Sequence, residues 1–571
     1  MLSLKQNGHT CLFKLRKMLL PTLISAGVLV VSACSSSLND KSEQVFLETR
    51  AELIEKLSAQ DNTFSALQAQ INTDDPESAE YWRWRIDQYL YGQYPEYQPI
   101  YNTYTQGKTF QQIYDLPPEQ LGPKKPQPLN TPELPDGYFT ENLPGNPHHG
   151  WHDVVDDKVY ISYQGQLTDP YVAIYNLKSQ QWDGPNKAAE STLSKGERKI
   201  DSHGRPIIEL DSKGHIHIVY GGHGGEREDG LNPLSIDTPH AGGRMLHVMS
   251  AKPYDISEFV YVNDITPFAS YTASEKMANG DIYLFTRAGT HKSPWVYYKM
   301  KSGEQRFEPP VVITWPTPQK DNPINVDTFY ITPLKISDTE IAISSLWHEC
   351  NFNEVHNKEN YGRINSYYMK LDTTTDTFYN AQQQKLTLPI TLATANQKTL
   401  AFDSTQREET PFGTSPIIRE DNVPAVAYQA RTKNYREWRM TAFENGEWKH
   451  SQPMPNTVNR TLFDSSNRQI DKIMRLEILA NNPNKNTALV IYKNAQGKSV
   501  FATAQRQDNT VQNWHVTKAH LSLANTRLSM EPIKNESGDV VAAIVNIKKG
   551  AAQRLYLWHE GQFRANNLLA N

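Results

Sequence analysis

The sequence predicts an all-β protein: a seven-bladed β-propeller with a small N-terminal helical extension. One pattern occurs seven times, an apolar run, a polar turn with Gly, Asp or Asn, and a second apolar and aromatic run. The helical period disappears from about residue 146, and no linker-like composition separates the repeats. Four short strands repeated seven times are typical of a propeller, whose radial closure protects the sheet edges. A run of β-sandwich modules is the alternative, but it would need linkers between its units.

The composition limits the possible functions. The chain of 571 residues has a formal net charge of −5, and it contains no basic stripe, so we expect no nucleic-acid partner. It contains 29 Tyr and 11 Trp, which suits β-rich structure with aromatic surfaces that can bind sugars. Aromatic strand residues also form ordinary cores and cross-strand pairs, so composition alone does not decide between these two roles.

The N-terminus predicts export. Basic residues precede an apolar run from residue 18 to 31, which ends in small residues before Cys34. This triplet resembles a bacterial lipobox, so residues 1–33 are predicted to be a lipoprotein signal peptide and Cys34 the lipidated residue. Because Ser35 follows in place of Asp, we expect an anchor in the outer membrane. Ordinary secretory cleavage is the alternative.

Two further segments precede the predicted propeller. Residues 34–100 are predicted to hold a tether and a helical segment, with one helix from Ser42 and a second after Ser78. Residues 101–145 are rich in Pro and Tyr and have little periodicity, so we expect an extended segment that wraps the domain surface. The propeller is then expected to occupy residues 146–571. Its seven predicted hairpins lie at residues 150–164, 206–220, 271–285, 331–347, 415–429, 476–493 and 529–546.

Chemically useful side chains stand at the ends of two neighbouring hairpins. A hairpin returns to the edge it left, so its entry and exit lie close together. These positions hold His203 and His223 on the second hairpin, and Tyr271 and Arg287 on the third. Each of them, taken alone, could be a structural residue. Together they make a candidate site on one face of the propeller.

These four side chains suit abstraction of a proton next to a carboxylate. An Arg is always cationic and matches a carboxylate, while Tyr and His can exchange a proton. In a polysaccharide that contains uronic acid, this chemistry is β-elimination. No paired carboxylates stand at comparable hairpin positions, which argues against ordinary glycoside hydrolysis.

The motifs SHGRP, YGGHGGE, ASYTASE and FTRAG, within seven repeats of an exported chain, resemble the seven-bladed β-propeller ulvan lyases. The resemblance covers roughly residues 145–571 and implies endolytic cleavage of ulvan, between sulfated rhamnose and a uronic acid. It also implies that His203 and Tyr271 are the acid/base residues, and that Arg287 and His223 neutralise the uronate carboxylate. Which of His203 and Tyr271 takes the C5 proton stays open.

A second constellation predicts a metal site. His348, Cys350 and His356 lie within nine residues and offer ligands that suit a structural zinc ion. The resemblance also implies a structural zinc in this part of the propeller. Asp327 and His291 are both candidates for the fourth ligand. A buried free thiol beside two incidental histidines is the alternative.

The remaining candidates bind substrate. His149 and Trp151 in the first repeat are candidates for sugar contacts, and Arg227 and Arg244 for contacts with sulfate. We expect a monomer with an anionic sulfated polysaccharide as its partner. Two other functions compete with the lyase hypothesis. A sialidase-like hydrolase would need a cluster of three Arg at hairpin ends, a Tyr nucleophile with a Glu, and Ser-x-Asp-x-Gly boxes. The sequence contains no set of these boxes. A non-catalytic surface lipoprotein that binds glycan would need Arg and aromatic residues alone.

Overall fold

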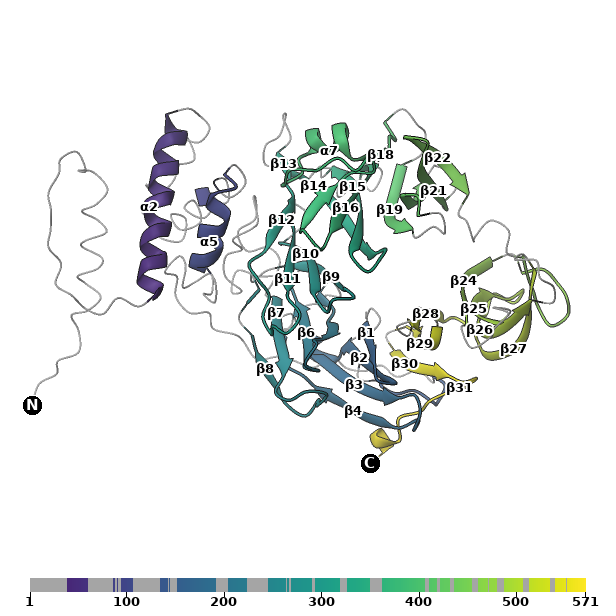
Figure 1. Ribbon diagram of the computed structural model, residues 1–571. Coiled ribbons are helices and arrows are strands. Elements are labelled where there is room, and N and C mark those ends of the chain that lie inside the picture. The colour runs from purple at the N-terminus through teal and green to yellow at the C-terminus, as the bar shows by residue number, and fades with distance from the viewer. Residues whose placement is uncertain are drawn as a thin grey trace, which may run out of the picture.

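The computed structural model describes most of the chain beyond residue 37. The described residues are 38–59, 86–87, 90, 94–105, 134–141, 143, 151–191, 204–222, 245–262, 264–265, 269–289, 293–318, 326–349, 362–405, 410–417, 422–431, 436–453, 461–470, 472–479, 487–506, 513–534, 540–550 and 552–570. Their strands form seven sheets, which Figure 1 shows around a common centre. We number the sheets in chain order.

Five of the sheets have four strands, each paired antiparallel with the next strand of the chain. The first sheet holds β1 (Trp151–Val155), β2 (Lys158–Gln164), β3 (Pro170–Asn176) and β4 (Trp182–Lys187), and the second sheet holds β5 (Ile207–Leu210), β6 (Ile216–Gly221), β7 (Met245–Ser250) and β8 (Phe259–Tyr261). The third sheet holds β9 (Ser270–Lys276), β10 (Ile282–Arg287), β11 (Trp295–Met300) and β12 (Val311–Thr314). The fifth sheet holds β19 (Thr410–Ile417), β20 (Ala425–Arg431), β21 (Arg436–Glu444) and β22 (Glu447–Pro453), and the seventh sheet holds β28 (Arg527–Lys534), β29 (Val540–Lys549), β30 (Ala552–His559) and β31 (Gln562–Phe563).

The other two sheets carry additional strands. In the sixth sheet β23 pairs with β27 in parallel, whereas every other pair is antiparallel. The fourth sheet holds β13 (Thr317–Pro318), β14 (Val326–Lys335), β15 (Glu340–Glu349), β16 (Gly362–Asp372), β17 (Thr377–Tyr379) and β18 (Leu400–Phe402), with helix α7 (Leu392–Lys398); the sixth holds β23 (Thr461–Phe463), β24 (Lys472–Ile478), β25 (Thr487–Lys493), β26 (Ser499–Arg506) and β27 (Asn513–Leu523).

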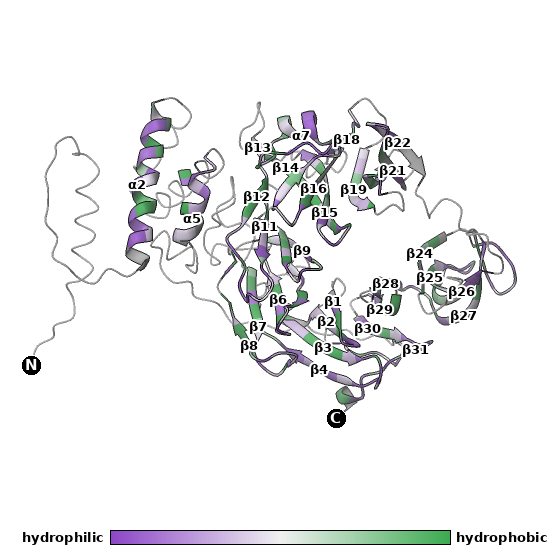
Figure 2. Cartoon of the chain, viewed as in Figure 1, coloured by the Kyte–Doolittle hydropathy of each residue, from purple (hydrophilic) through white to green (hydrophobic). Residues whose placement is uncertain are grey.

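Each of the seven hairpins expected from the sequence lies in a separate sheet, as the pairs β1–β2, β5–β6, β9–β10, β14–β15, β19–β20, β24–β25 and β28–β29. The four turns that lie in the described ranges, between β1 and β2, β5 and β6, β9 and β10, and β14 and β15, fall where the Gly, Asp and Asn residues predicted them. Gly214, for example, has a φ of +83° between β5 and β6, a backbone conformation that glycine adopts without strain. Figure 2 shows apolar and polar residues interspersed along the strands, as sheets with differently covered faces require.

The last sheet lies against the first sheet and against a preceding segment of the chain. Phe139 and Leu143 pack in one apolar cluster with residues of the first and seventh sheets. Thr140 forms a β-bridge with Leu555 of β30, and the Phe139 amide donates to the Leu555 carbonyl at 2.9 Å. Phe139 and Thr140 therefore contact the seventh sheet, and Phe139 also packs against the first.

The helical extension is built from α2 (Leu38–Ser58) and α5 (Tyr97–Thr105). Phe46 of α2 stacks on Tyr104 of α5, with ring centroids 4.1 Å apart, and Arg50 forms an ion pair with buried Asp87. The sequence predicted α2 from Ser42, four residues after its actual start. It did not predict α5, which spans the boundary at residue 100 between the expected helical segment and the segment expected to be extended.

The extension packs beside the sheets that carry the candidate site. Its buried residues belong to one apolar cluster with Ile207 of the second sheet and Leu284 of the third. The short 3-10 helices Gln166–Thr168 and Asn567–Ala570 complete the described elements. No helix in the described ranges is long and apolar enough to cross a membrane.

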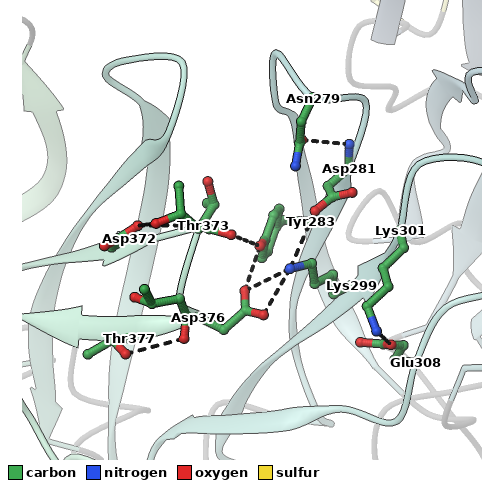
Figure 3. A network of polar contacts seen from close by, with 12 residues as sticks. Asn279, Asp281, Tyr283, Lys299, Lys301, Glu308, Asp372, Thr373, Asp376 and Thr377 are labelled. Carbon is green, nitrogen blue, oxygen red and sulfur yellow. Dashed lines mark hydrogen bonds and ion pairs between the residues drawn. The ribbon is translucent and has the colours of Figure 1, made fainter.

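A polar network joins the third sheet to the fourth (Figure 3). The Lys299 ammonium group lies 2.8 Å from a carboxylate oxygen of Asp376 and 3.3 Å from one of Asp281. The Tyr283 hydroxyl donates to Asp376 at 2.6 Å. Lys299 is 8% exposed, so its charge depends on these two carboxylates in place of water.

We predict that Lys299→Met lowers the free energy of unfolding by about 1–3 kcal/mol, because it leaves two carboxylates close together without their cation. Urea unfolding followed by tryptophan fluorescence measures this loss. Lys301→Met is the matched control, since Lys301 pairs with Glu308 at the surface, where such pairs contribute about 0–1 kcal/mol. Equal losses in both variants would contradict the proposed importance of the buried network.

Candidate active site

The β9–β10 hairpin places Tyr271 and Arg287 at one end of the third sheet. In the pairing, Ser270 opposes Arg287 and Ala273 opposes Phe285. Two residues of β9, Tyr271 and Thr272, therefore face one residue of β10, which is a β-bulge. Tyr271 has a φ of +58°, which is uncommon for a residue with a large side chain. The bulge turns the Tyr271 side chain out of the regular alternation of the strand.

Arg287 is a buried cation. Its residue is 1% exposed, and its Nε donates to the Ser270 hydroxyl at 3.1 Å, which in turn donates to the Gly289 carbonyl at 2.6 Å. Within the described ranges, Arg287 has no carboxylate in ion-pair distance, and its Nη1 has no hydrogen-bond acceptor. Because a buried unpaired charge is costly, this arrangement favours a bound anion.

Aromatic rings and guanidinium groups alternate in a row that begins at this hairpin. The Arg287 guanidinium carbon lies 4.6 Å from the ring centroid of Tyr271 and 5.1 Å from that of Tyr330. The guanidinium carbon of Arg363 also lies close to Tyr330, at 4.5 Å from its ring centroid. The same carbon lies 4.5 Å from the ring centroid of Phe412. We call these five residues, Tyr271, Arg287, Tyr330, Arg363 and Phe412, the cation–aromatic row.

The row connects three sheets. Tyr330 lies on β14, Arg363 on β16 and Phe412 on β19, and the Arg363 Nη1 donates to the Phe412 carbonyl at 2.7 Å. The site thus presents two guanidinium groups beside the ring of one tyrosine, Tyr330. This arrangement can bind two anionic groups, and it can place one of them beside the Tyr271 phenol.

His348 lies beside this row. In the β14–β15–β16 ladder it opposes Thr328 and Arg363, and it is fully buried. Its ring lies 5.3 Å from that of Tyr330, at 89°. Directly opposed residues share a face of a sheet, so the register places Asp327 on the other face. Of the two candidate fourth ligands, Asp327 is therefore disfavoured by the register.

Most of the other predicted site residues lie outside the described ranges: His203, His223, His149, Arg227, Arg244, Cys350, His356, His291 and the predicted lipidation site Cys34. Trp151 begins β1, but its side chain is not among those described. Within the described ranges, no three His, Cys, Asp or Glu side chains converge to hold a metal ion.

Backbone contacts bring the ends of the second and third sheets together. A Cβ atom at Gly222, which directly follows β6, would lie 1.7 Å from the Ala269 carbonyl oxygen, so only glycine fits there. The Thr272 hydroxyl donates to the Arg205 carbonyl, which precedes β5, at 3.3 Å. Arg205 and Gly222, at the entry and exit of the β5–β6 hairpin, therefore both lie beside the start of β9.

Four site residues were not predicted from the sequence: Arg205, Tyr330, Arg363 and Phe412. Arg205 stands in the SHGRP motif, two residues after His203, so its motif could have identified it. Tyr330 directly precedes the fourth repeat, a place similar to that of Tyr271 in the third, which is also a usable signal. Arg363 lies on β16, the strand that follows the β14–β15 hairpin, and no repeated sequence pattern distinguishes it.

A buried carboxyl group lies farther along the same inner strands. Glu209 of β5 accepts a hydrogen bond from the Ser274 hydroxyl of β9 at 2.6 Å, and it is 9% exposed. Burial raises its pKa well above the ordinary value of 4.5, and the charge of Asp153 raises it further, while Lys276 opposes the shift. Glu275 shows the same effect, since burial raises its pKa to about 7.

We predict that Glu209→Gln reduces the loss of stability that accompanies rising pH. A carboxyl group with a raised folded-state pKa gives stability that is full below the unfolded pKa and is lost as pH rises through the folded pKa. The variant, which cannot ionise, should therefore gain in free energy of unfolding relative to the wild type from about pH 4.5 upward. The limiting slope is about 1.4 kcal/mol per pH unit.

Urea unfolding at a series of pH values measures this difference. The exposed Glu304→Gln is the control and should leave the pH dependence of stability unchanged. A constant offset between Glu209→Gln and the wild type at all pH values would contradict the prediction.

Comparisons with known proteins agree with this geometry. The profile of the BNR repeat-containing family matches residues 158–455. The chain is 36% identical over 330 residues to an ulvan lyase of family PL25 from Pseudoalteromonas sp. (strain PLSV), an alignment that covers 55% of this chain and 66% of that protein. It is 37% identical over 305 residues to an ulvan lyase from Alteromonas sp. (strain LOR), which covers 51% and 61%.

The aligned part thus spans slightly less than two thirds of each of these relatives. A solved structure of a PL25 ulvan lyase bound to -[GlcA(1-4)Rha3S]- matches more of the length. Its TM-score is 0.59 at 30% identity, and the match covers 75% of this chain and 96% of that one.

Proposed function

The chain belongs to the BNR repeat-containing family, and we propose that it is a polysaccharide lyase that cleaves ulvan by β-elimination. The observation that carries this proposal is the pair of Tyr271 and buried Arg287 at the bulged end of the β9–β10 hairpin. A phenol beside an anion receptor is the minimum that abstraction of a proton next to a carboxylate requires. The identity to ulvan lyases, 36–37%, supports the substrate.

In the proposed reaction, a base removes the proton from C5 of the uronic acid. The electron pair of that C–H bond forms the C4–C5 double bond, the C4–O4 bond breaks, and an acid protonates O4 of the leaving sugar. We assign Arg287 and His223 to the uronate carboxylate, where a cation stabilises the charge that develops. Tyr271 and His203 are assigned to the two proton transfers, in an order that depends on which uronic acid is bound.

We also propose that the seven sheets close into a seven-bladed β-propeller with the helical extension on its outside. The first strands β1, β5, β9, β14 and β19 lie beside one another in that order, and β28 lies beside β1. This order supports a ring, and residues 134–140 would tie its two ends together. The inner hairpin ends would then share one face, where a long polymer has access.

The substrate contacts extend this proposal. Two guanidinium groups in the cation–aromatic row suit a polymer that carries a sulfate ester next to a uronate, and the open face suits endolytic cleavage. We assign His149, Trp151, Arg227 and Arg244 to further sugar and sulfate contacts. A glycan-binding protein without catalysis would need the arginines and the rings, but it would not need Tyr271 held on a strained bulge.

Ultraviolet absorbance of the purified protein mixed with ulvan tests the function, because elimination creates a conjugated unsaturated uronate and hydrolysis does not. We expect absorbance to rise with ulvan, and average chain length to fall early in the reaction. Tyr271→Phe should lower kcat by about 100-fold or more, since acid–base catalysis contributes at least that much. It should still bind ulvan, because the cation–aromatic row is retained.

Heparin, alginate and pectin are the control polymers, and the last two carry uronates without sulfate. Reducing ends that appear without absorbance would mean a hydrolase. Binding of ulvan without any cleavage would favour the non-catalytic alternative.

Three properties rest on sequence alone and remain proposals. We propose a lipid anchor on Cys34 in the outer membrane, a structural zinc ion held by His348, Cys350 and His356, and a monomeric state. The buried imidazole of His348 suits a structural ligand.

Native mass spectrometry of the detergent-solubilised full-length protein measures all three properties. We expect one protomer that begins at a diacylated cysteine and carries one zinc ion, and Cys350→Ser should lose the zinc. A dimer mass, an unmodified N-terminus or a wild-type protein without zinc would each contradict one of these proposals.

A further inference from the structure

We propose that Ser270 is a positioning residue for the reaction: its hydroxyl holds the Nε side of the Arg287 guanidinium, so that the substrate carboxylate is received at the Nη end. The inference rests on the proposed function, because it concerns the same anion receptor. Ser270 stands in the motif ASYTASE, directly before Tyr271, and neither this motif nor the comparisons assign a role to it.

The strand pairing fixes Ser270 beside Arg287. The two residues oppose each other in the β9–β10 ladder, next to the bulge that holds Tyr271. Ser270 is fully buried, Arg287 is 1% exposed, and the Ser270 carbonyl accepts from the Thr286 hydroxyl at 3.2 Å. The Ser270 hydroxyl therefore has protein groups as its hydrogen-bond partners.

Hydrogen bonding assigns the direction of both contacts of this hydroxyl. A serine hydroxyl has one hydrogen to donate and two lone pairs that accept. The Gly289 carbonyl, 2.6 Å away, can only accept, and the Arg287 Nε–H, 3.1 Å away, can only donate. The hydroxyl therefore donates to Gly289 and accepts from Arg287. This assignment follows from the chemistry of the two partners and does not depend on where a hydrogen atom is placed.

The bond at Nε limits how a carboxylate can pair with Arg287. A guanidinium binds a carboxylate through two parallel N–H groups, either Nε with one Nη or the two Nη groups together. Because the Nε–H of Arg287 already donates to Ser270, the second arrangement is the one left. Its Nη1 has no hydrogen-bond acceptor among the described residues. The Tyr271 ring lies 4.6 Å from the guanidinium carbon, so the orientation of this group also sets where the carboxylate lies relative to the phenol.

A matched pair of variants separates support of the guanidinium from support of the backbone. Ser270→Ala removes the acceptor and leaves the buried Nε–H of Arg287 without it. Thr286→Val is the control, because it removes a buried hydroxyl of the facing strand. That hydroxyl bonds to the Ser270 and Arg287 carbonyls and not to the guanidinium. Neither variant changes the charge of the protein, so general attraction for a polyanion is the same in both.

Calorimetric titration of the full-length protein measures the effect without turnover when every variant also carries Tyr271→Phe. The two probes are ulvan and carboxyl-reduced ulvan, in which the uronates are converted to neutral sugars and the sulfates are kept. The ratio of the two Kd values reports recognition of the carboxylate. We expect Ser270→Ala to lower the preference for native ulvan about 10-fold, since bonds to charged groups are among the stronger ones. Thr286→Val should leave the preference unchanged.

A double-mutant cycle shows whether Ser270 acts through Arg287. Arg287→Lys keeps the positive charge but has no guanidinium Nε–H for the hydroxyl to hold. In this background, Ser270→Ala should change the preference for native ulvan by less than about 2-fold. In the protein that retains Tyr271, Ser270→Ala should lower kcat on ulvan more than it raises KM, because charge develops on the carboxylate in the transition state.

An unchanged preference in Ser270→Ala overturns the inference, and so does an equal loss in Thr286→Val or a full loss in the Arg287→Lys background. Circular dichroism and thermal melting identify a variant that fails to fold. Ser270→Cys then carries the test, because its sulfur is a weak acceptor and should also lower the preference. If the preference falls as expected but the wild type forms no unsaturated product, the proposed function fails and the anion receptor stands. If the wild type cleaves ulvan and the preference is unchanged, the inference alone fails.

Discussion

The buried guanidinium of Arg287 is the constraint around which the site is built. A cation that is 1% exposed and has no carboxylate partner among the described residues needs other stabilisation. The rings of Tyr271 and Tyr330 supply part of it, and the Ser270 hydroxyl accepts one hydrogen bond. These contacts hold the Arg287 guanidinium in place and leave its Nη1 without an acceptor, so that a planar anion can pair with it. In the proposed reaction, this unpaired guanidinium is the group that receives the uronate carboxylate.

Such a charge is tolerable only on a rigid support. The β9–β10 hairpin pairs with β11, and the Lys299 network joins the turn end of this hairpin to the fourth sheet. The same rigidity holds Tyr271 at a φ of +58°. Strain of this kind persists where the surroundings determine the backbone, and it is concentrated at functional sites. The bulge sets the direction of the Tyr271 side chain, and the sheets around it hold the backbone in this conformation.

The sequence predicted what depends on local pattern. Turn residues between apolar runs located all seven hairpins, and the structure brings together Tyr271 and Arg287, the two candidates at the ends of the third hairpin. The contributions of Arg363 and Phe412 depend on how the fourth and fifth sheets approach each other, which no local pattern reveals. Helix α5 was not predicted because Pro99 stands in its first turn, where proline is tolerated, within a stretch that reads as extended. Its Tyr97, Tyr101 and Tyr104 nonetheless have the helical spacing that packs on Phe46.

The charge distribution along the inner strands explains how a chain with net charge −5 can present a cationic site. At the end of β5 and β9 that holds Tyr271, the charged groups among the described residues include Arg205, Arg287 and Arg363, while Glu531 near Arg205 pairs with Arg475. Farther along the same strands, Asp153 pairs with Lys276, and burial keeps Glu209 from ionising readily. The carboxyl groups closest to the site are therefore paired or disfavoured as anions. The local field at the hairpin ends is positive even though the whole chain is not, and it is the local field that an anionic polymer meets on binding.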